Sequence, residues 1–320
     1  MPLKEIMVTA DIAALWDSFN YNSGFIAVKP TDVSKRLYHT AKTISNENNT
    51  LDDQMCLNKA IEILTKKNAG LNIVALNKKR FLSGLEYFEK PQRWLATEKQ
   101  KCDQKNKSSC ACVIHNNWIV SKAAKVYRFR EHLMWMYDGD DRYYTSNTRL
   151  YLTYINHVRS FAAPKVTREA ELSALKTAMT IGYFLNRTVI LPKFHVYSGV
   201  NVSKVPLNFF LYIASFDNEF FGSYRESSFL LHPKVPFDVK SGLFKQNIAK
   251  MFQKSFSARR YIISEVDLVS QFGNLKNKVL VFKSLHNIYV VFKNSTESTA
   301  FKLRLSRAFV SSSYRQHKRW

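Results

Sequence analysis

The sequence is poor in residues that break regular structure, with 9 glycines and 8 prolines among 320 residues. This scarcity excludes a fibrous or linker-like protein, because both need glycine or proline at high frequency. Hydrophobic residues make up 46% of the chain and aromatic residues 14%. That composition supports a sizeable core and excludes a globally disordered chain. At about 150 residues per domain, the length predicts two domains.

Signatures of several common protein classes are missing. Neither G-x-G-x-x-G nor G-x4-G-K-[ST] occurs, which excludes the simplest dehydrogenases and P-loop proteins. No G-x-S-x-G occurs, and no Cys/His pair has protease spacing, so the sequence argues against a nucleophilic hydrolase. A secretory leader and an apolar run of 18 residues are also absent. The sequence therefore predicts no membrane anchor within this chain.

Acidic residues are few: 25 Asp and Glu stand against 48 Lys and Arg, and the formal net charge is +23. This excess predicts either a polyanionic partner or a basic enzyme surface that meets acidic glycans or sugar nucleotides. The basic residues are scattered, and no zinc-finger spacing, basic zipper or RNP-type motif occurs. Nucleic acid is therefore not the expected partner.

Cysteine is also scarce, with four residues, three of them within Lys101–Cys112. Cys110 and Cys112 lack the C-x2-C spacing of zinc sites. A local disulfide from Cys102 to Cys110 or Cys112 is expected instead, and it would imply an oxidising compartment. Asn106, the first residue of an N-x-S/T sequon in this polar stretch, is the best candidate for glycosylation.

The first half of the chain shows the apolar patterns of an α/β layer. Phe25–Val28 is expected to be a buried strand, entered through a turn at Asn22–Gly24. Helices are expected over Thr31–Ser45 and Leu51–Lys67, with Thr31 as an N-cap. Further elements are expected as a strand at Leu71–Leu76, a polar loop at Lys90–Ser109, a strand at Ala111–Val120 and a helix at Ala123–Met136.

The second half begins after a loop at Tyr137–Asn147, where we place the domain boundary, giving domains 1–150 and 151–320. Arg168–Phe184 has the periodicity of an amphipathic helix. A strand is predicted at Thr188–Leu191, stopped by Pro192. Further strands are expected at Tyr261–Ile263, Val279–Phe282 and Ile288–Phe292. The pattern predicts a second α/β domain.

Polar residues at two places in the first half are candidates for binding a sugar. Asp52, Asp53 and Gln54 open a predicted helix, where acidic residues are also favoured by the helix dipole alone. At the mouth of an α/β sheet the same side chains could accept hydrogen bonds from sugar hydroxyls. Asn22-Ser23-Gly24 is either a plain turn or a second set of groups for the same sugar.

Charged residues further along the chain are the remaining candidates. His115 lies in an apolar strand, as either a core residue or a metal ligand. Lys122 and Lys125 either meet phosphate or occupy an exposed helix face. Asp138-Gly139-Asp140-Asp141 contains a D-x-D that either binds a divalent cation or forms a solvated turn.

Three segments occur in an order that resembles the nucleotide-diphospho-sugar transferase domain, best known from plant rhamnogalacturonan xylosyltransferases. They are Y-N-S-G-F-I-A-V-K-P-T (Tyr21–Thr31), L-D-D-Q-M-C-L-N-K-A-I (Leu51–Ile61) and H-N-N-W-I-V (His115–Val120). The resemblance covers about residues 1–150. Ala174–Phe194 is similar to a helix–strand unit of fucosyltransferase-like proteins, so the second domain is expected to be an appended α/β domain.

The resemblance implies a GT-A, Rossmann-like fold and a retaining, metal-dependent glycosyltransferase. Its donor would be a nucleotide-diphospho-sugar and its acceptor a glycan or glycoprotein. Members are type II membrane proteins of the Golgi, which implies a Golgi lumen location. By resemblance, Asn22, Ser23 and Gly24 line the donor pocket, with Lys122 or Lys125 on the diphosphate. Asp52, Asp53 and Gln54 face the acceptor or the transferred sugar, and His115 is a metal ligand.

In that family a D-x-D binds the divalent metal, commonly Mn²⁺, and precedes a segment similar to Met1–Trp16. The chain is therefore expected to begin just past this motif, with the main acidic ligands upstream of Met1 and the first strands missing. A partial GT-A domain of this kind leaves two functions open. One is glycosyl transfer, and the other is a non-catalytic glycan-binding or scaffolding role.

Overall fold

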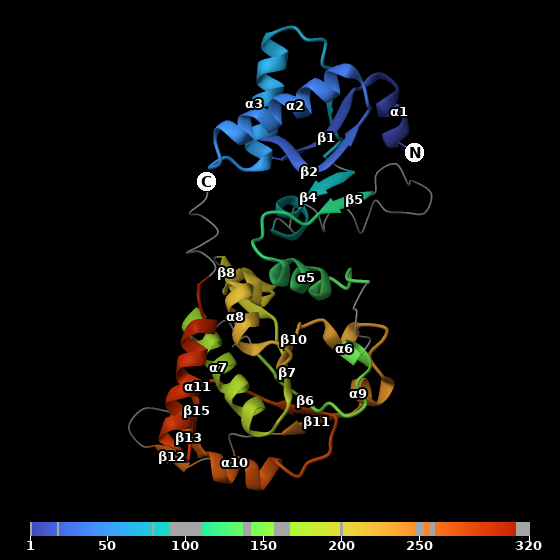
Figure 1. Ribbon diagram of the computed structural model, residues 1–320. Coiled ribbons are helices and arrows are strands. Elements are labelled where there is room, and N and C mark those ends of the chain that lie inside the picture. Colours follow the sequence, from blue (N-terminus) through green and yellow to red (C-terminus); the bar gives the residue numbers. More distant parts are fainter. Residues whose placement is uncertain are drawn as a thin grey trace. The chain divides into compact units, whose positions relative to one another are not determined.

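The computed structural model of the protein describes residues 2–17, 19–78, 80–89, 111–136, 142–156, 167–198, 201–246, 253–255 and 260–311. The chain forms two compact units, Met1–Ile119 (unit 1) and Val120–Trp320 (unit 2). Figure 1 shows the helices and strands of each unit. The predicted polar loop, the D-x-D at 138–141, the sequon at 106 and the cysteines at 102 and 110 lie outside the described residues.

Unit 1 is built on β1, the central strand of a three-stranded sheet in the order β2-β1-β3. β2 runs antiparallel to β1, and β3 runs parallel to it. Successive β1 side chains alternate between two cores, with Ile12 and Ala14 on one face and Ala13 and Leu15 on the other. Because both faces are covered, the strand is a continuous apolar run. The three strands are β1 (Ile12–Asp17), β2 (Asn20–Val28) and β3 (Ile73–Ala75).

Two capped helices, α2 (Asp32–Glu47) and α3 (Asp53–Lys66), cover one face of this sheet. Thr31 accepts a hydrogen bond from Ser34 N at the start of α2, and Asp52 accepts one from Met55 N at the start of α3. Such side-chain caps satisfy backbone donors that have no partner within the helix. Both predicted helices and the N-cap at Thr31 are confirmed.

The predicted turn at Asn22–Gly24 is wrong, because these residues lie inside β2. A register shift in β1 between Ala14 and Trp16 lets the long β2 strand continue past it. Asn, Ser and Gly favour turns when read alone. Here β2 continues through them between two stretches that pair with β1, although none of the three residues pairs with β1 itself.

The opposite face of the sheet packs on α1 and on a two-stranded parallel ribbon, β4 and β5. The ribbon's register sets Ser83 beside His115 at the carboxyl ends of its strands. The strand predicted at 71–76 is confirmed as β3, and the strand predicted at 111–120 is present only as the three residues of β5. The elements are α1 (Pro2–Thr9), β4 (Phe81–Ser83), the π-helix η1 (Leu85–Glu89) and β5 (Val113–His115).

Unit 2 contains a five-stranded parallel sheet in the order β10-β7-β6-β14-β11. A buried cluster on this sheet includes Tyr151 of β6, Ile190 of β7 and Val279 of β14. The strand predicted at 279–282 is confirmed as β14, and the strand at 188–191 as β7, whereas β6 was not predicted. The strands are β6 (Tyr151–Tyr154), β7 (Thr188–Ile190), β10 (Tyr224–Arg225), β11 (Leu243–Gln246) and β14 (Val279–Phe282).

The long helix α7 (Arg168–Phe184) has the predicted bounds and buries Leu175, Ala178 and Met179. Two smaller sheets accompany the parallel one, β12-β13-β15 and β8-β9, and β13 and β15 confirm the strands predicted near 261 and 288. The strands are β8 (Phe194–Ser198), β9 (Asn201–Val205), β12 (Gln253–Ser255), β13 (Arg260–Ser264) and β15 (Ile288–Val291). The helices of this part are α8 (Ile213–Phe220), α9 (Phe237–Ser241), α10 (Glu265–Phe272), α11 (Ser295–Ala308), η3 (Leu207–Phe209) and η4 (Phe229–Leu231).

The boundary between the units lies between Ile119 and Val120, before the loop at which the sequence placed it. The reason is the packing of α5 (Lys122–Glu131), which belongs to unit 2 together with α6 (Arg142–Thr145). The Tyr127 hydroxyl of α5 accepts a hydrogen bond from Leu207 N, and the Glu131 carboxylate accepts bonds from Ser227. These buried bonds fix α5 to the second core.

Candidate functional site

Polar side chains of unit 1 gather where β1, β4 and β5 end and where α3 begins. Asp17 is the last residue of β1, and Asn117 follows β5 by two residues. The Asn117 amide bonds to Asp17, and its oxygen accepts from Gly84 N just after β4. Carboxyl ends of parallel strands and a helix amino terminus are favoured positions for ligands. We name this set of side chains the strand-end cluster.

Asp17 is the buried hub of the strand-end cluster, with 6% of its surface exposed. Its Oδ2 accepts from Asn22 Nδ2 at 3.2 Å and from Asn117 Nδ2 at 2.5 Å. Its Oδ1 accepts from Trp118 Nε1 at 2.6 Å. A buried carboxylate needs such donors to offset its lost hydration. Asp17 therefore holds neighbouring groups in place.

Asn22 links this hub to the start of α3. Its Nδ2 also donates to Gln54 Oε1 at 3.0 Å, and its Oδ1 accepts from Gly24 N at 2.8 Å. Both ends of the Asn22 amide are thus engaged, and the bond to Gln54 orients that side chain as well. The Nε2 of Gln54 makes no hydrogen bond with the residues that the structure describes.

Ser23 and Asp53 form the outer layer of the strand-end cluster. Ser23 Oγ donates to Asp53 Oδ2 at 2.9 Å, and Asp53 is exposed at the start of α3. Within the described part of the chain, Asp53 Oδ1 has no donor. A sugar hydroxyl both donates and accepts. The pair Asp53 Oδ1 and Gln54 Nε2 offers one acceptor and one donor to such a group.

His115 lies against Gly24, next to the other residues of the strand-end cluster. A Cβ added to Gly24 would come within 2.8 Å of His115 Cε1 and 2.9 Å of His115 Nε2. Gly24 is exposed and His115 is half-buried. The imidazole can therefore reach both the β2 backbone and solvent only because residue 24 has no side chain.

Most of the predicted sugar-binding residues are brought together by the structure. Bonds join Asn22 to Gln54 and Ser23 to Asp53, and Gly24 contacts His115. Asp52 is different, because its Oδ1 accepts from Met55 N at 2.8 Å and so caps α3. Lys122 and Lys125 lie on α5 in unit 2. Their predicted contact with a diphosphate stays a prediction.

Sequence reasoning missed Asp17 and Trp118 as members of this cluster. One signal was available for Asp17, namely an acidic residue that closes the apolar run Ile12–Leu15. Trp118 has a left-handed backbone with φ of 58°, which is uncommon for a bulky residue and costs free energy. Its bond to Asp17 helps to hold that backbone in place, and a local sequence pattern does not reveal it.

The described residues do not form a metal site. No group of three or more His, Cys, Asp and Glu side chains in that part of the chain is arranged to hold an ion. Asp17 has both oxygens engaged by nitrogen donors. The predicted ligand His115 therefore lacks a complete donor set among these residues.

Comparison with protein families gives a match over residues 5–129, to the family described as nucleotide-diphospho-sugar transferase. The match contains every residue of the strand-end cluster. Residues 5–129 match the domain of this family, and we call them the transferase domain. This transferase domain extends ten residues beyond the structural boundary and takes in most of α5. The mixed α/β fold agrees with the predicted Rossmann-like domain followed by a second α/β region.

Other comparisons add little to the transferase domain. A search of curated proteins finds no match. Among solved structures, the chain is similar to POFUT1 in complex with GDP-fucose, at 10% sequence identity and a TM-score of 0.26. The similarity covers 49% of this chain and 51% of that one, about half of each, and at this TM-score it supports no inference. None of the described helices is long and apolar enough to cross a membrane.

Proposed function

We propose that the transferase domain binds a nucleotide-diphospho-sugar at the strand-end cluster and transfers its sugar to a glycan or glycoprotein. The observation that supports this most is the junction of Asn22–Gly24, Asp53–Gln54 and His115 at the carboxyl ends of the strands. Side chains far apart in sequence are brought together there by two hydrogen bonds and by the close approach of His115 to Gly24. Such pre-organisation is how a protein positions a reacting sugar.

The donor sugar would lie over the outer layer of the cluster. Asp53 Oδ1 would accept a bond from a sugar hydroxyl, and Gln54 Nε2 would donate to the same or an adjacent oxygen. Because Ser23 and Asn22 fix these two side chains, little side-chain entropy is lost on binding. Unoccupied polar atoms also make the site selective, since a ligand lacking the hydroxyl leaves them unpaired.

The reaction proposed is transfer with retention at the anomeric carbon. The acceptor oxygen forms a bond to the anomeric carbon while the bond between that carbon and the diphosphate oxygen breaks. The departing diphosphate takes up the acceptor proton. No base on the acceptor side is required in this scheme. Catalysis would come from positioning and from donors that stabilise developing charge. The anomeric configuration of the product, measured by NMR during the reaction, tests this point.

The decisive comparison uses two aspartates at helix starts. Asp53→Asn removes a carboxylate from the cluster, whereas Asp32→Asn removes one from the first turn of α2, where the side chain is 95% exposed. Release of nucleoside diphosphate from a panel of nucleotide sugars is measured for both variants and for the parent chain. One charged hydrogen bond corresponds to roughly tenfold or more, so kcat/KM should fall about that much in Asp53→Asn alone.

The result that refutes the proposal is equal kcat/KM in Asp53→Asn, Asp32→Asn and the parent chain. Dependence on Mn²⁺ is measured in the same assay by adding and removing the ion. The Golgi lumen remains the predicted location, and it is tested by asking whether the expressed protein carries glycans on its sequons.

A further inference from the structure

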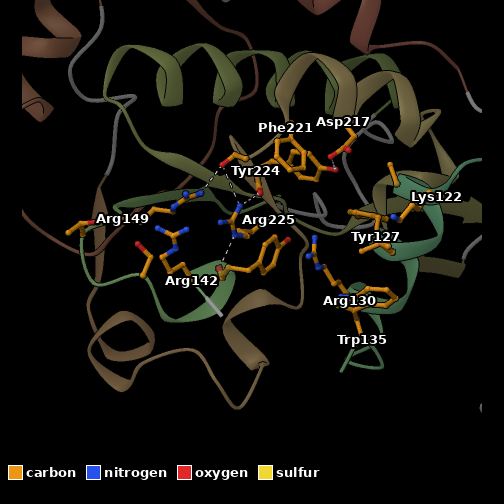
Figure 2. Close-up of a pocket in the computed structure, with 16 residues that line it drawn as sticks. Lys122, Tyr127, Arg130, Trp135, Arg142, Arg149, Asp217, Phe221, Tyr224 and Arg225 are labelled. Carbon is orange, nitrogen blue, oxygen red and sulfur yellow. Dashed lines mark hydrogen bonds between the residues drawn. The ribbon is translucent and has the colours of Figure 1, made fainter. Parts of the chain in front are cut away.

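Unit 2 contains a cavity of about 930 Å³ that has no part in the strand-end cluster (Figure 2). It lies beside β10, between α5 and α6, and reaches Arg149, which precedes β6 by two residues. Its volume is at the upper end of the range for small-molecule sites. We name it the arginine cavity.

The arginine cavity has a strong excess of positive charge. Among the described residues that line it, Asp217 is the one carboxylate, and its Oδ1 accepts a bond from the Tyr224 hydroxyl at 2.8 Å. Five cationic side chains stand against it. They are Lys122, Arg130, Arg142, Arg149 and Arg225.

Within the described part of the chain, neither Arg149 nor Arg225 forms an ion pair with a carboxylate, although the buried carboxylate of Glu226 lies near Arg225. Arg149 Nη1 donates to Gly222 O at 2.9 Å, and Arg225 Nη1 donates to Tyr224 O at 2.7 Å. Both acceptors are neutral carbonyls. Burial lowers the pKa of Arg225 below its ordinary value; the nearby charge of Arg149 acts in the same direction, and Tyr143, Tyr151 and Glu226 partly offset the two. An anion bound between the two guanidinium groups would relieve this repulsion.

Tyr143 fixes two of the guanidinium groups in position. Arg130 Cζ lies 3.6 Å and Arg225 Cζ lies 4.0 Å from its ring centroid. The Tyr143 hydroxyl donates to Glu226 Oε2 at 2.6 Å, which holds the ring. Guanidinium groups placed on an aromatic ring are oriented before a ligand arrives. The arginine cavity therefore presents two pre-oriented cations to an incoming anion.

We propose that the arginine cavity binds an acidic oligosaccharide that carries carboxylate or sulfate groups on successive sugars. Its cations come from α5, α6, β10 and the segment before β6, and Figure 2 shows Lys122 and Arg149 at opposite ends. Charges spread in this way match a ligand with repeated anionic groups better than a single diphosphate. Nucleic acid is disfavoured because its backbone is tracked by an open groove.

The choice of a saccharide among anions rests on the glycosyl transfer proposed for unit 1, but binding itself does not require that activity. The formal net charge of +23 would further attract such a ligand. Uronate and sulfate offer the same bidentate geometry to arginine. Both are therefore tested separately.

Calorimetric titration of the full chain tests this proposal with four hexamer-length probes. They are a heparin-derived hexasaccharide, a galacturonic acid hexamer, a neutral maltohexaose and a single-stranded DNA hexamer. We expect binding of one or both acidic saccharides and no binding of the neutral one. Binding of the galacturonic acid hexamer would show that carboxylates suffice, and binding of the heparin-derived probe alone, which carries both groups, would show that sulfate is required.

Matched arginine variants locate the binding. Arg149→Gln should raise Kd about tenfold, because one charge-assisted contact is lost. Arg36→Gln is the control, since its guanidinium in unit 1 also donates one bond to a carbonyl, that of Ala69, and it should change Kd less than twofold. Arg142→Gln, on the exposed side of α6, repeats the test if Arg149→Gln fails to fold.

The proposal is overturned by no binding of either acidic saccharide, or by equal weakening in the Arg149 and Arg36 variants. Tighter binding of DNA than of both saccharides would assign the cavity to nucleic acid instead. Asp53→Asn should leave Kd within twofold of the parent value. A chain that binds the saccharide without transferring sugar thus contradicts the proposed transfer and leaves the arginine cavity assigned.

Discussion

At residue 24, the lack of a side chain determines where the imidazole of His115 can lie. The two residues are far apart in sequence and touch only because β2 runs through Asn22–Gly24 as a strand. A glycine between Ser23 and Phe25 suggested a turn. Its actual role is close approach, which depends on a partner that the local sequence does not reveal.

A double-mutant cycle on this contact is the test at the residue scale. Gly24→Ala should lower the free energy of unfolding by about 1 kcal/mol or less, because the new Cβ overlaps only the far end of the imidazole, which has to shift. In a His115→Ala background the same change should cost almost nothing. Urea unfolding of the four proteins gives the coupling, and additive losses would show that the contact does not control stability.

Residue types at the site were more predictable than their roles. Asp53 and Gln54 were identified because carboxylates and amides at a helix start suit a sugar. Asp52 is the same kind of residue, one position earlier, yet it caps the helix. The rotation of about 100° between neighbouring helix positions sends such residues to different faces. Only the position of the first helical residue decides between them.

At the scale of elements, α3 and β2 are tied together by the side chain of Asn58. Its Oδ1 accepts from Tyr21 N at 3.0 Å, and its Nδ2 donates to Tyr21 O at 2.8 Å. The same Nδ2 donates to Gln54 O. The Asn58 amide therefore pairs with both backbone groups of Tyr21, as a neighbouring strand would. It also fixes the spacing between Asn22 and Gln54.

Asn58→Ala should lower the free energy of unfolding by about 2 kcal/mol, since it leaves backbone groups of β2 without partners. It should also reduce donor hydrolysis, because Gln54 loses its fixed distance from Asn22. Lys59→Ala, the next residue of the helix and exposed, is the control and should stay within about 0.5 kcal/mol. Similar losses in both variants would mean that the tie has no special role.

Helices were predicted better than strands. α7 has the bounds that its periodicity indicated, and α2 begins at the predicted cap. β1 was not predicted, because Ala13 and Ala14 have little preference for strands and their burial comes from both neighbouring layers. β6 is only four residues long and owes its place to β7 and β14 on its two sides.

On the scale of the whole molecule, unit 2 contains an acidic group that should make stability depend on pH. Burial raises the pKa of Glu131 from 4.5 to about 7, and the bonds from Ser227 only partly offset this. Glu226 raises the value and Lys193 lowers it. Because the folded pKa lies above the unfolded one, the folded chain binds more protons between these values, and stability falls as pH rises through them.

Glu131→Gln should remove this part of the pH dependence. At 1.36 kcal/mol per pKa unit, a shift from 4.5 to about 7 corresponds to roughly 3 kcal/mol at most. The variant should therefore gain stability over the parent at pH 8 and lose that gain at pH 4. Chemical denaturation at both pH values measures the difference, and an equal offset at the two would contradict the assignment.

The position of α5 affects how this protein can be divided. The family match ends at 129, inside a helix whose buried Tyr127 and Glu131 are bonded to groups of the second core. A fragment cut at the end of the match would carry most of α5 without its packing partners, and the remaining chain would lose the contacts that α5 makes with the second core. A domain exchange between proteins at residue 129 would therefore destabilise both resulting chains. The segment just before Lys122, at the boundary between the units, is the better point for such an exchange.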